Sequence, residues 1–229
     1  MPVPLFESHL EWLKTNGYST LALHEFEAVL AGAVKPKHKS VLITFDDGNF
    51  SDFEIALPAL QARGLDAVSF VITSRIGKAG YLTWANLRAM QESGRIAIQS
   101  HSHSHEKWNL QAENLKSVVE DIALSRVLIS QELSVNESEL SHLAWPWGRC
   151  TPKLEQLAFE SGMKYQYLVQ RGAVNKPDQT LRLPRWCCDN VDLRQFSRGL
   201  HGLSNSLLAC LNNHVYGCVR QVKHGMAYR

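Results

Sequence analysis

The sequence predicts an α/β fold in which parallel strands alternate with helices, as a two-layer or barrel architecture. About seven strand-then-helix units can be counted through most of the 229 residues. Polar, imidazole and aromatic residues directly follow several predicted strands, where parallel barrels carry their reactive groups. The length suits one such barrel, and no repeat or low-complexity linker divides the chain. We therefore expect one domain over residues 1–229.

The residues before the central strand predict two helices and one short strand. Residues 5–18 place apolar side chains at helical spacing and end at Asn16-Gly17, a helix stop. A strand-like stretch at 20–23 and a helical one at 25–30 follow. The basic residues at 35–39 are typical of a solvated loop.

The central strand is predicted at residues 41–45, which are β-branched or apolar with no polar face and therefore indicate a buried strand. Asp46, Asp47 and Gly48 follow it directly. Two adjacent carboxylates at a strand end repel each other and lose hydration, so they require a cation or a shared proton. The alternative is that one aspartate caps the next helix.

A second cluster, Ser100-His101-Ser102-His103-Ser104-His105, follows the predicted strand 95–99. Neutral imidazole is a good zinc ligand, although a polar solvated loop is the alternative. In an extended chain His101 and His105 would lie about 13 Å apart, too far to share an ion. A helical first turn would bring positions i and i+4 together. We therefore expect a turn after His101, with His103 pointing elsewhere.

The rest of the chain alternates in the same way. Helical patterns cover 52–62, with a kink or late start implied by Pro58, and 83–92, 110–133, 151–161 and 193–200. Strand patterns cover 67–72, 141–145, 165–169 and 181–187, and residues 171–180 read as a polar loop.

Three motifs resemble those of the polysaccharide deacetylases, the NodB-homology or carbohydrate esterase family 4 group. They are Thr44-Phe45-Asp46-Asp47-Gly48, His101-Ser102-x-x-His105 and Ala144-Trp145-Pro146-Trp147-Gly148. The third looks closest to the branch that deacetylates poly-β-1,6-N-acetylglucosamine. The resemblance runs from about Phe6 to Leu200 and implies a distorted, incomplete (β/α)7 barrel.

The resemblance also implies roles for individual residues. Asp47, His101 and His105 would bind a divalent metal, most simply Zn²⁺, with Ni²⁺ or Co²⁺ as alternatives. Asp46 would be the general base, and the backbone N–H of Trp147 would stabilise the oxyanion. Arg185 would orient the site, and a surface or ion-pair arginine is an equal alternative.

The sequence departs from the family pattern in three places. Ala144 stands where many members carry an arginine. No Leu-x-His motif supplies a general acid near the C-terminus, since His201 and His214 lie in a different context. Many members also have an earlier strand ending in Tyr-His. Because no general acid is found, a degenerate relative with little turnover is the alternative to an active enzyme.

Tryptophans recur near the motifs, at positions 84, 108, 145, 147 and 186. Core packing explains any one of them most simply. One or two could line a sugar-binding groove, and Trp147 is the strongest candidate for the site.

The function that these features predict is metal-dependent N-deacetylation, a hydrolysis of a carbon–nitrogen bond in an amino sugar of a polysaccharide or surface-glycan intermediate. A degenerate metal- and glycan-binding relative is the runner-up, and hydrolysis of a cyclic amide is disfavoured because such relatives often lack the Asp-Asp pair. The sequence leaves the sugar, the linkage and the oligomeric state open.

Composition excludes some partners and predicts a compartment. A net charge of +2 indicates no nucleic-acid partner. No apolar run is long enough for a spanning helix, and the N-terminus has no readable signal peptide. An odd number of cysteines, with no Cys-x-x-Cys spacing, favours reduced thiols. We therefore expect a cytoplasmic enzyme acting on an intermediate of surface-polysaccharide synthesis, such as lipopolysaccharide O-antigen.

Overall fold

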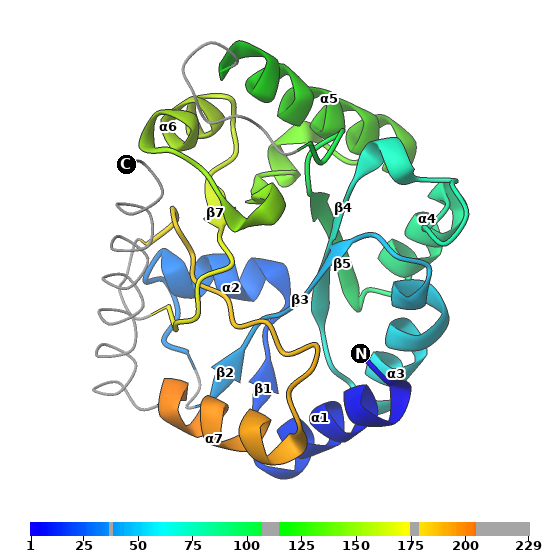
Figure 1. Cartoon of the computed structure of the whole chain (residues 1–229), viewed down its shortest axis with the longest axis vertical. Coiled ribbons are helices and arrows are strands. Elements are labelled where there is room, and N and C mark those ends of the chain that lie inside the picture. The colour runs from blue at the N-terminus through cyan, green and yellow to red at the C-terminus, as the bar shows by residue number, and fades with distance from the viewer. Residues whose placement is uncertain (37–38, 107–114, 175–178, 205–229) are drawn as a thin grey trace, which may run out of the picture.

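Five parallel strands follow one another in sequence order across one curved sheet (Figure 1). The computed structural model describes residues 1–36, 39–106, 115–174 and 179–204. The strands are β3 (Ile43–Asp47), β4 (Ala67–Val71), β5 (Ile96–Ser100), β6 (His142–Ala144) and β7 (Tyr165–Tyr167). A separate parallel pair joins β1 (Ser19–Thr20) to β2 (Ser40–Val41). This open, curved sheet confirms the predicted incomplete barrel.

Helices connect the strands, and most of them cover the outside of the sheet, whereas α2 lies within its curve (Figure 1). They are α1 (Val3–Thr15), α2 (Leu23–Leu30), α3 (Leu57–Arg63), α4 (Trp84–Glu92), α5 (Leu115–Leu133), α6 (Pro152–Glu160) and α7 (Leu193–Ser204). A π-helix, η1 (Asp52–Ala56), precedes α3, and 3₁₀ turns lie at η2 (Thr73–Arg75), η4 (Glu137–Glu139) and η5 (Pro146–Gly148).

The core lies between the sheet and the helices. Every residue of β4 is buried, as expected for a strand with parallel neighbours on both sides and helices on its face. Apolar residues from α3, α4 and α5, including Leu60, Leu87 and Ile129, pack against it. A further group joins α2 to β4 and β7 through Phe26, Phe70 and Tyr167.

Two strand predictions need correction. The predicted strand 41–45 is divided between β2 and β3, and each residue of β3 is only partly buried. The predicted strand 181–187 is wrong as a continuous strand. Backbone hydrogen bonds at Leu183 and Arg185 hold the segment along β7, but its one β-bridge is that of Leu183 to Tyr167. Pro184 has no N–H to donate, and Arg182 has a φ of 55°, which is incompatible with a strand.

The predicted helix over 52–62 is interrupted just before Pro58, as the proline requires. A proline within an α-helix clashes with the carbonyl four residues earlier. The chain forms η1 first, and α3 then begins at Leu57 with the proline in its first turn. The predicted helix 110–133 is described from Leu115, and its first residues lie outside the described part of the chain.

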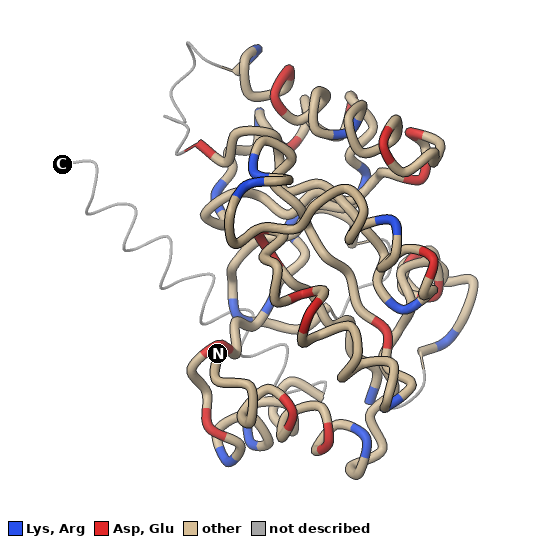
Figure 2. The backbone as a smooth tube through the Cα atoms, turned by 90° about the vertical axis from the view of Figure 1, so that its right-hand side faces the viewer, with Lys and Arg blue, Asp and Glu red and all other residues tan. Residues whose placement is uncertain are grey.

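Charged residues are interspersed over the surface. Figure 2 shows basic and acidic positions mixed along the visible elements rather than gathered on one face. No helix within the described residues is long and apolar enough to cross a bilayer.

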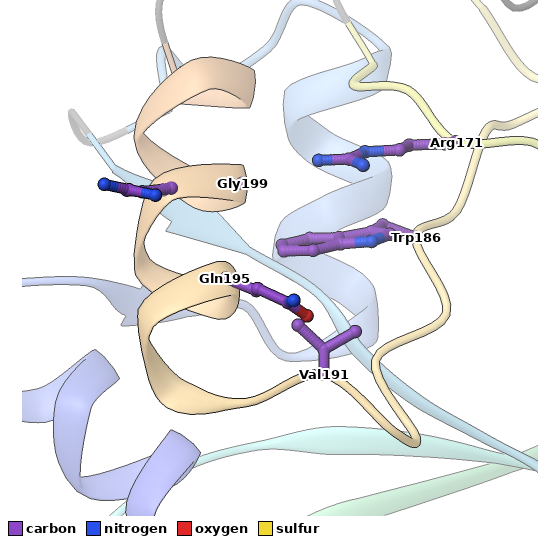
Figure 3. A pocket seen from close by; sticks show the side chains of 6 residues that line it. Arg171, Trp186, Val191, Gln195 and Gly199 are labelled. Carbon is purple, nitrogen blue, oxygen red and sulfur yellow. The ribbon is translucent and has the colours of Figure 1, made fainter.

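Helix α7 packs on α1 through Phe196 and also makes one close contact with Trp186. The Trp186 ring lies against Gly199 and stacks on Phe196, with centroids 5.9 Å apart (Figure 3). A Cβ at Gly199 would overlap the indole. Glycine is therefore required here by space rather than by backbone conformation.

Gly199→Ala should lower the free energy of unfolding by about 1 to 3 kcal/mol, because the added methyl overpacks the contact with Trp186. Gly202→Ala is the matched control on the same helix, since nothing lies within 4 Å of its added Cβ. There the helix propensity of alanine should give a gain of up to about 1 kcal/mol. Denaturant unfolding of both variants checks this, and equal effects would contradict the contact.

Candidate active site

Asp46 and Asp47 close strand β3, and the chain turns sharply after them. Asp47 has a φ of 78° and Gly48 a φ of 72°, both in the left-handed region. A Cβ on Gly48 would lie 3.1 Å from Val71 Cγ1. Glycine thus fits both the turn and the close approach to β4, and the turn places the two carboxylates at the carboxyl edge of the sheet.

The histidine cluster leaves β5 at the same edge. His101 N–H donates to Val71 O at 2.9 Å, so the ladder continues to His101. The chain then bends through Ser102, with a φ of 69°, and His105, with a φ of 56°. Ser102 Oγ accepts from His105 N–H at 3.0 Å. The predicted helical turn is therefore wrong, and a left-handed bend closes the distance instead.

His101 and His105 come together in this bend while His103 faces away. The rings of His101 and His105 lie 4.8 Å apart. His103 Nδ1 lies 2.9 Å from Thr73 Oγ1, outside the cluster that Asp47 joins.

Asp121 anchors the loop that carries the histidines, a role that the sequence reasoning missed. Its carboxylate oxygens, on α5, accept from His103 N–H at 2.8 Å and from Ser104 N–H at 3.0 Å. The only signal in the sequence is an acidic residue directly beside the apolar positions of α5, where Ile122 is fully buried.

Asp47, His101 and His105 have the spacing of a metal-ligand set. Asp47 Oδ1 lies 3.5 Å from His101 Nε2 and 3.6 Å from His105 Nε2. One ligand atom from each residue lies within 4.8 Å of the others. Atoms held by a tetrahedral Zn²⁺ at its usual bond lengths lie roughly 3.3 to 3.6 Å apart. The donor set therefore fits a divalent ion.

Both imidazoles are set up as neutral ligands. Burial lowers the pKa of His101 and of His105, and the neighbouring His101 lowers that of His105 further. His101 Nδ1 donates to the carbonyl of Ala144 at 2.7 Å, which leaves the Nε2 lone pair facing Asp47. A hydrogen bond from the second ring nitrogen is the usual way in which a metal-binding histidine is oriented.

Asp46 is held by a bidentate contact with Arg185. Arg185 Nη1 donates to Oδ1 at 2.6 Å, and Nη2 donates to Oδ2 at 2.7 Å. Burial raises the pKa of Asp46, but the charge and hydrogen bonds of Arg185 outweigh it and leave that pKa below its usual range. Oδ2 also lies 4.0 Å from His101 Nε2. An ionised carboxylate therefore sits beside the ligand set.

A third carboxylate, Asp52, lies behind this pair and was missed because its position resembles a helix cap. It is buried in η1 and accepts from Ser69 Oγ at 3.0 Å. Burial raises its pKa to about 7, against the hydrogen bond from Ser69, and the charges of Asp46 and Asp47 add to the rise. This carboxyl is therefore poised to hold a proton.

Trp147 is the tryptophan that lies at the site. It is 58% exposed, and its ring lies 5.4 Å from that of His105. Trp147 has a φ of 59°. At the next residue, Gly148, an added Cβ would lie 2.5 Å from Val169 N. This tight turn presents the indole at the rim.

The other tryptophans lie elsewhere. Trp145 is fully buried and donates to Gln166 Oε1, and Trp84 packs against the core. Trp186 lines a pocket of about 330 Å³ beneath Arg171, between α7 and the segment after β7 (Figure 3). Trp108 lies outside the described residues.

His201 is not at the candidate site. It lies on α7, where its Nδ1 donates to Ser197 O at 2.8 Å, and its ring lies beside that of Trp12. His214 lies outside the described residues.

Comparisons with known proteins agree with this geometry. The polysaccharide deacetylase family model matches residues 33–166. The Bacillus subtilis protein YxkH is 31% identical over 188 residues, which cover 81% of this chain and 64% of that protein. The poly-beta-1,6-N-acetyl-D-glucosamine N-deacetylase of Staphylococcus epidermidis is 29% identical over 196 residues, covering 81% and 66%. The chain thus spans slightly less than two thirds of these relatives.

Among solved structures, IcaB from Ammonifex degensii superposes with a TM-score of 0.79 at 22% identity, covering 90% of each chain. The Streptococcus pyogenes deacetylase PplD superposes with a TM-score of 0.77 at 24% identity, covering 86% of each chain. At these identities the structures establish a shared fold. The family model matches more than half of the residues, and the chain therefore belongs to the polysaccharide deacetylase family.

Proposed function

We propose that this protein is a metal-dependent N-deacetylase that hydrolyses an acetamide on an amino sugar of a polysaccharide or surface-glycan intermediate. One observation carries the proposal: a carboxylate and two imidazoles converge on one point beside a second carboxylate held by an arginine. The curated relatives named as poly-β-1,6-N-acetylglucosamine deacetylases support this substrate class.

Asp47, His101 and His105 would hold the metal, for which Zn²⁺ is the first choice and Ni²⁺ or Co²⁺ also suit the donors. When bound, such an ion polarises a carbonyl and acidifies a water molecule. The protein contributes the neutral state and fixed orientation of His101, through the carbonyl of Ala144.

Asp46 is the proposed general base. Arg185 keeps it ionised and fixes both of its oxygens, and Oδ2 lies closest to His101 Nε2. Asp46 accepts a proton from the attacking water as the new C–O bond forms. The C–N bond then breaks, and the leaving nitrogen needs a proton.

We assign that proton to Asp46 as well. No general acid is assigned from the sequence, and His201 lies on α7, where its Nδ1 donates to Ser197 O. Proton return by the same carboxyl balances the reaction without a second acid. The backbone N–H of Trp147 is the proposed oxyanion donor, and its exposed indole offers a face to a sugar ring.

We further propose one domain in a reducing compartment. Cys187 and Cys188 form no disulfide in the part of the chain that the structure describes, which suits a cytoplasmic protein. A glycan intermediate assembled there would be the substrate.

Asp46→Asn should lower acetate release from N-acetylated β-1,6-linked glucosamine oligosaccharides by at least about a hundredfold, because the base is lost. The variant should retain Zn²⁺, since Asp46 is not in the ligand set. Acetate assay together with metal analysis measures both. A wild-type protein that binds Zn²⁺ and glycan without releasing acetate would instead support a degenerate binding relative.

Arg185→Met should move the acid limb of the pH–rate profile to higher pH. The base works only when ionised, so the rate falls as the pH drops through the pKa of Asp46. Arg185 lowers that pKa against the effect of burial, so its removal raises the pKa and the limb moves up. The control is Arg182→Met, because the guanidinium of Arg182 contacts Glu155 and not Asp46. An unmoved limb in Arg185→Met would contradict the assignment.

His105→Ala should lose bound Zn²⁺ on dialysis, because two donors bind a divalent ion far more weakly than three. His103→Ala, from the same loop, should retain it, since that ring faces Thr73. Metal content after dialysis distinguishes the two. Full occupancy in His105→Ala would remove His105 from the ligand set.

A further inference from the structure

We propose that Glu27, His142 and Tyr167 form a hydrogen-bonded chain, centred on the buried His142, that positions Arg185 and, through it, Asp46. The inference rests on the proposed function, because it assigns a task to side chains inside the barrel that have no contact with the ligand set. None of the three belongs to a motif that the sequence analysis singled out.

The chain is continuous and closely packed. His142 is fully buried, and its Nε2 lies 2.8 Å from Glu27 Oε1 while its Nδ1 lies 2.8 Å from the hydroxyl of Tyr167. The Tyr165 ring stacks on His142 with centroids 4.2 Å apart and planes 19° from parallel. The imidazole is thus held at both nitrogens and on one face.

One arrangement of protons satisfies every atom. The hydroxyl of Tyr167 donates to Nδ1, and Nε2–H donates to the Glu27 carboxylate. The opposite tautomer would face a nitrogen lone pair toward the carboxylate. The pKa directions agree with this arrangement. The hydrogen bond from His142 lowers the pKa of Glu27. Burial lowers the pKa of His142 and raises the pKa of Tyr167.

Tyr167 forms part of the floor under Arg185. The guanidinium carbon lies 5.9 Å from the centroid of Tyr167 and 5.6 Å from that of Phe70, and these two rings lie 5.0 Å apart. Cation–π contacts of this kind orient a guanidinium. The hydroxyl of Tyr167 is tied to His142, so the ring cannot shift along the strand, and the forked contact with Asp46 keeps its geometry.

The same strand pair supports the metal side of the site. Tyr167 of β7 lies opposite Ala144 of β6, whose carbonyl accepts from His101. His142 begins that strand, and α2, which supplies Glu27, packs on Tyr167 through Phe26 (Figure 1). The chain therefore stabilises the register on which both Arg185 and His101 depend.

The test compares kcat and KM for acetate release by the Zn²⁺-loaded full chain and its variants. Tyr167→Phe and His142→Leu should lower kcat about tenfold with KM changed less than about twofold, since displacing a catalytic group by a fraction of an ångström affects the chemical step. Glu27→Gln, which keeps an acceptor, should retain most of kcat, whereas Glu27→Leu should not. Ile129→Val, a core truncation on α5, is the control that lowers stability alone.

A double-mutant comparison separates positioning from mere stability. In an Arg185→Met background, Tyr167→Phe should cause no further loss of kcat, because the hydroxyl acts through Arg185 while the backbone pairing of Tyr167 with Ala144, which serves His101, stays in place. An additive loss, or a folded Tyr167→Phe with wild-type kcat, would overturn the inference.

A readout without turnover keeps the two proposals distinguishable. Nitrogen-15 NMR of the histidine side chains should show His142 as the Nε2–H tautomer, with a shift of Nδ1 in Tyr167→Phe. A charged His142 or an Nδ1–H tautomer at neutral pH would overturn the chain. Absence of acetate release by the wild type would overturn the proposed function instead.

Discussion

The structure depends on keeping two adjacent carboxylates at the end of one strand. Asp46 and Asp47 follow each other in β3, lose hydration and repel each other. The fold gives each carboxylate a separate partner. Arg185 engages both oxygens of Asp46, whereas Asp47 turns toward two imidazole nitrogens with the spacing of a cation site. The adjacent acids thereby acquire different environments, and different environments allow different chemical roles.

Residues with left-handed backbone conformations turn Asp47 toward the edge that it shares with Asp46 and aim the other side chains of the site. A strand residue points its side chain opposite to its neighbour, so Asp47 must leave the strand to share an edge with Asp46. Its positive φ achieves that, and Ser102, His105 and Trp147 adopt the same region where their own chain segments meet the site. Such conformations cost free energy in non-glycine residues and persist where the surroundings impose them. Here Asp121, Ser102 Oγ and the packing of Gly148 on Val169 impose them.

Sequence reasoning predicted the parts of this arrangement that local pattern specifies. Alternating strands and helices predicted the barrel, and the carboxyl ends of β3 and β5 located the acids and histidines. It was wrong on the helical turn after His101 and on the strand at 181–187. Both errors share a cause: the backbone at Ser102, His105 and Arg182 adopts positive φ, which is uncommon for residues other than glycine. At 181–187, Pro184 adds a second cause, since it has no N–H to donate. Asp121 and His142 were missed because their partners lie far away in the sequence.

The departure at Ala144 has a physical counterpart in the structure. Where many family members carry an arginine, this chain has a small buried residue whose carbonyl orients His101. The cation that faces Asp46 comes instead from Arg185, in the extended segment that leaves β7. Backbone hydrogen bonds hold this segment along β7, including one from Arg185 N–H to Gln170 O at 2.9 Å, but the guanidinium at the far end of the side chain needs contacts of its own. The aromatic floor of Phe70 and Tyr167 supplies them. Because Arg185 lies outside the sheet, its position depends on side chains inside the barrel. His142 and Glu27 fix the Tyr167 ring on which the guanidinium rests.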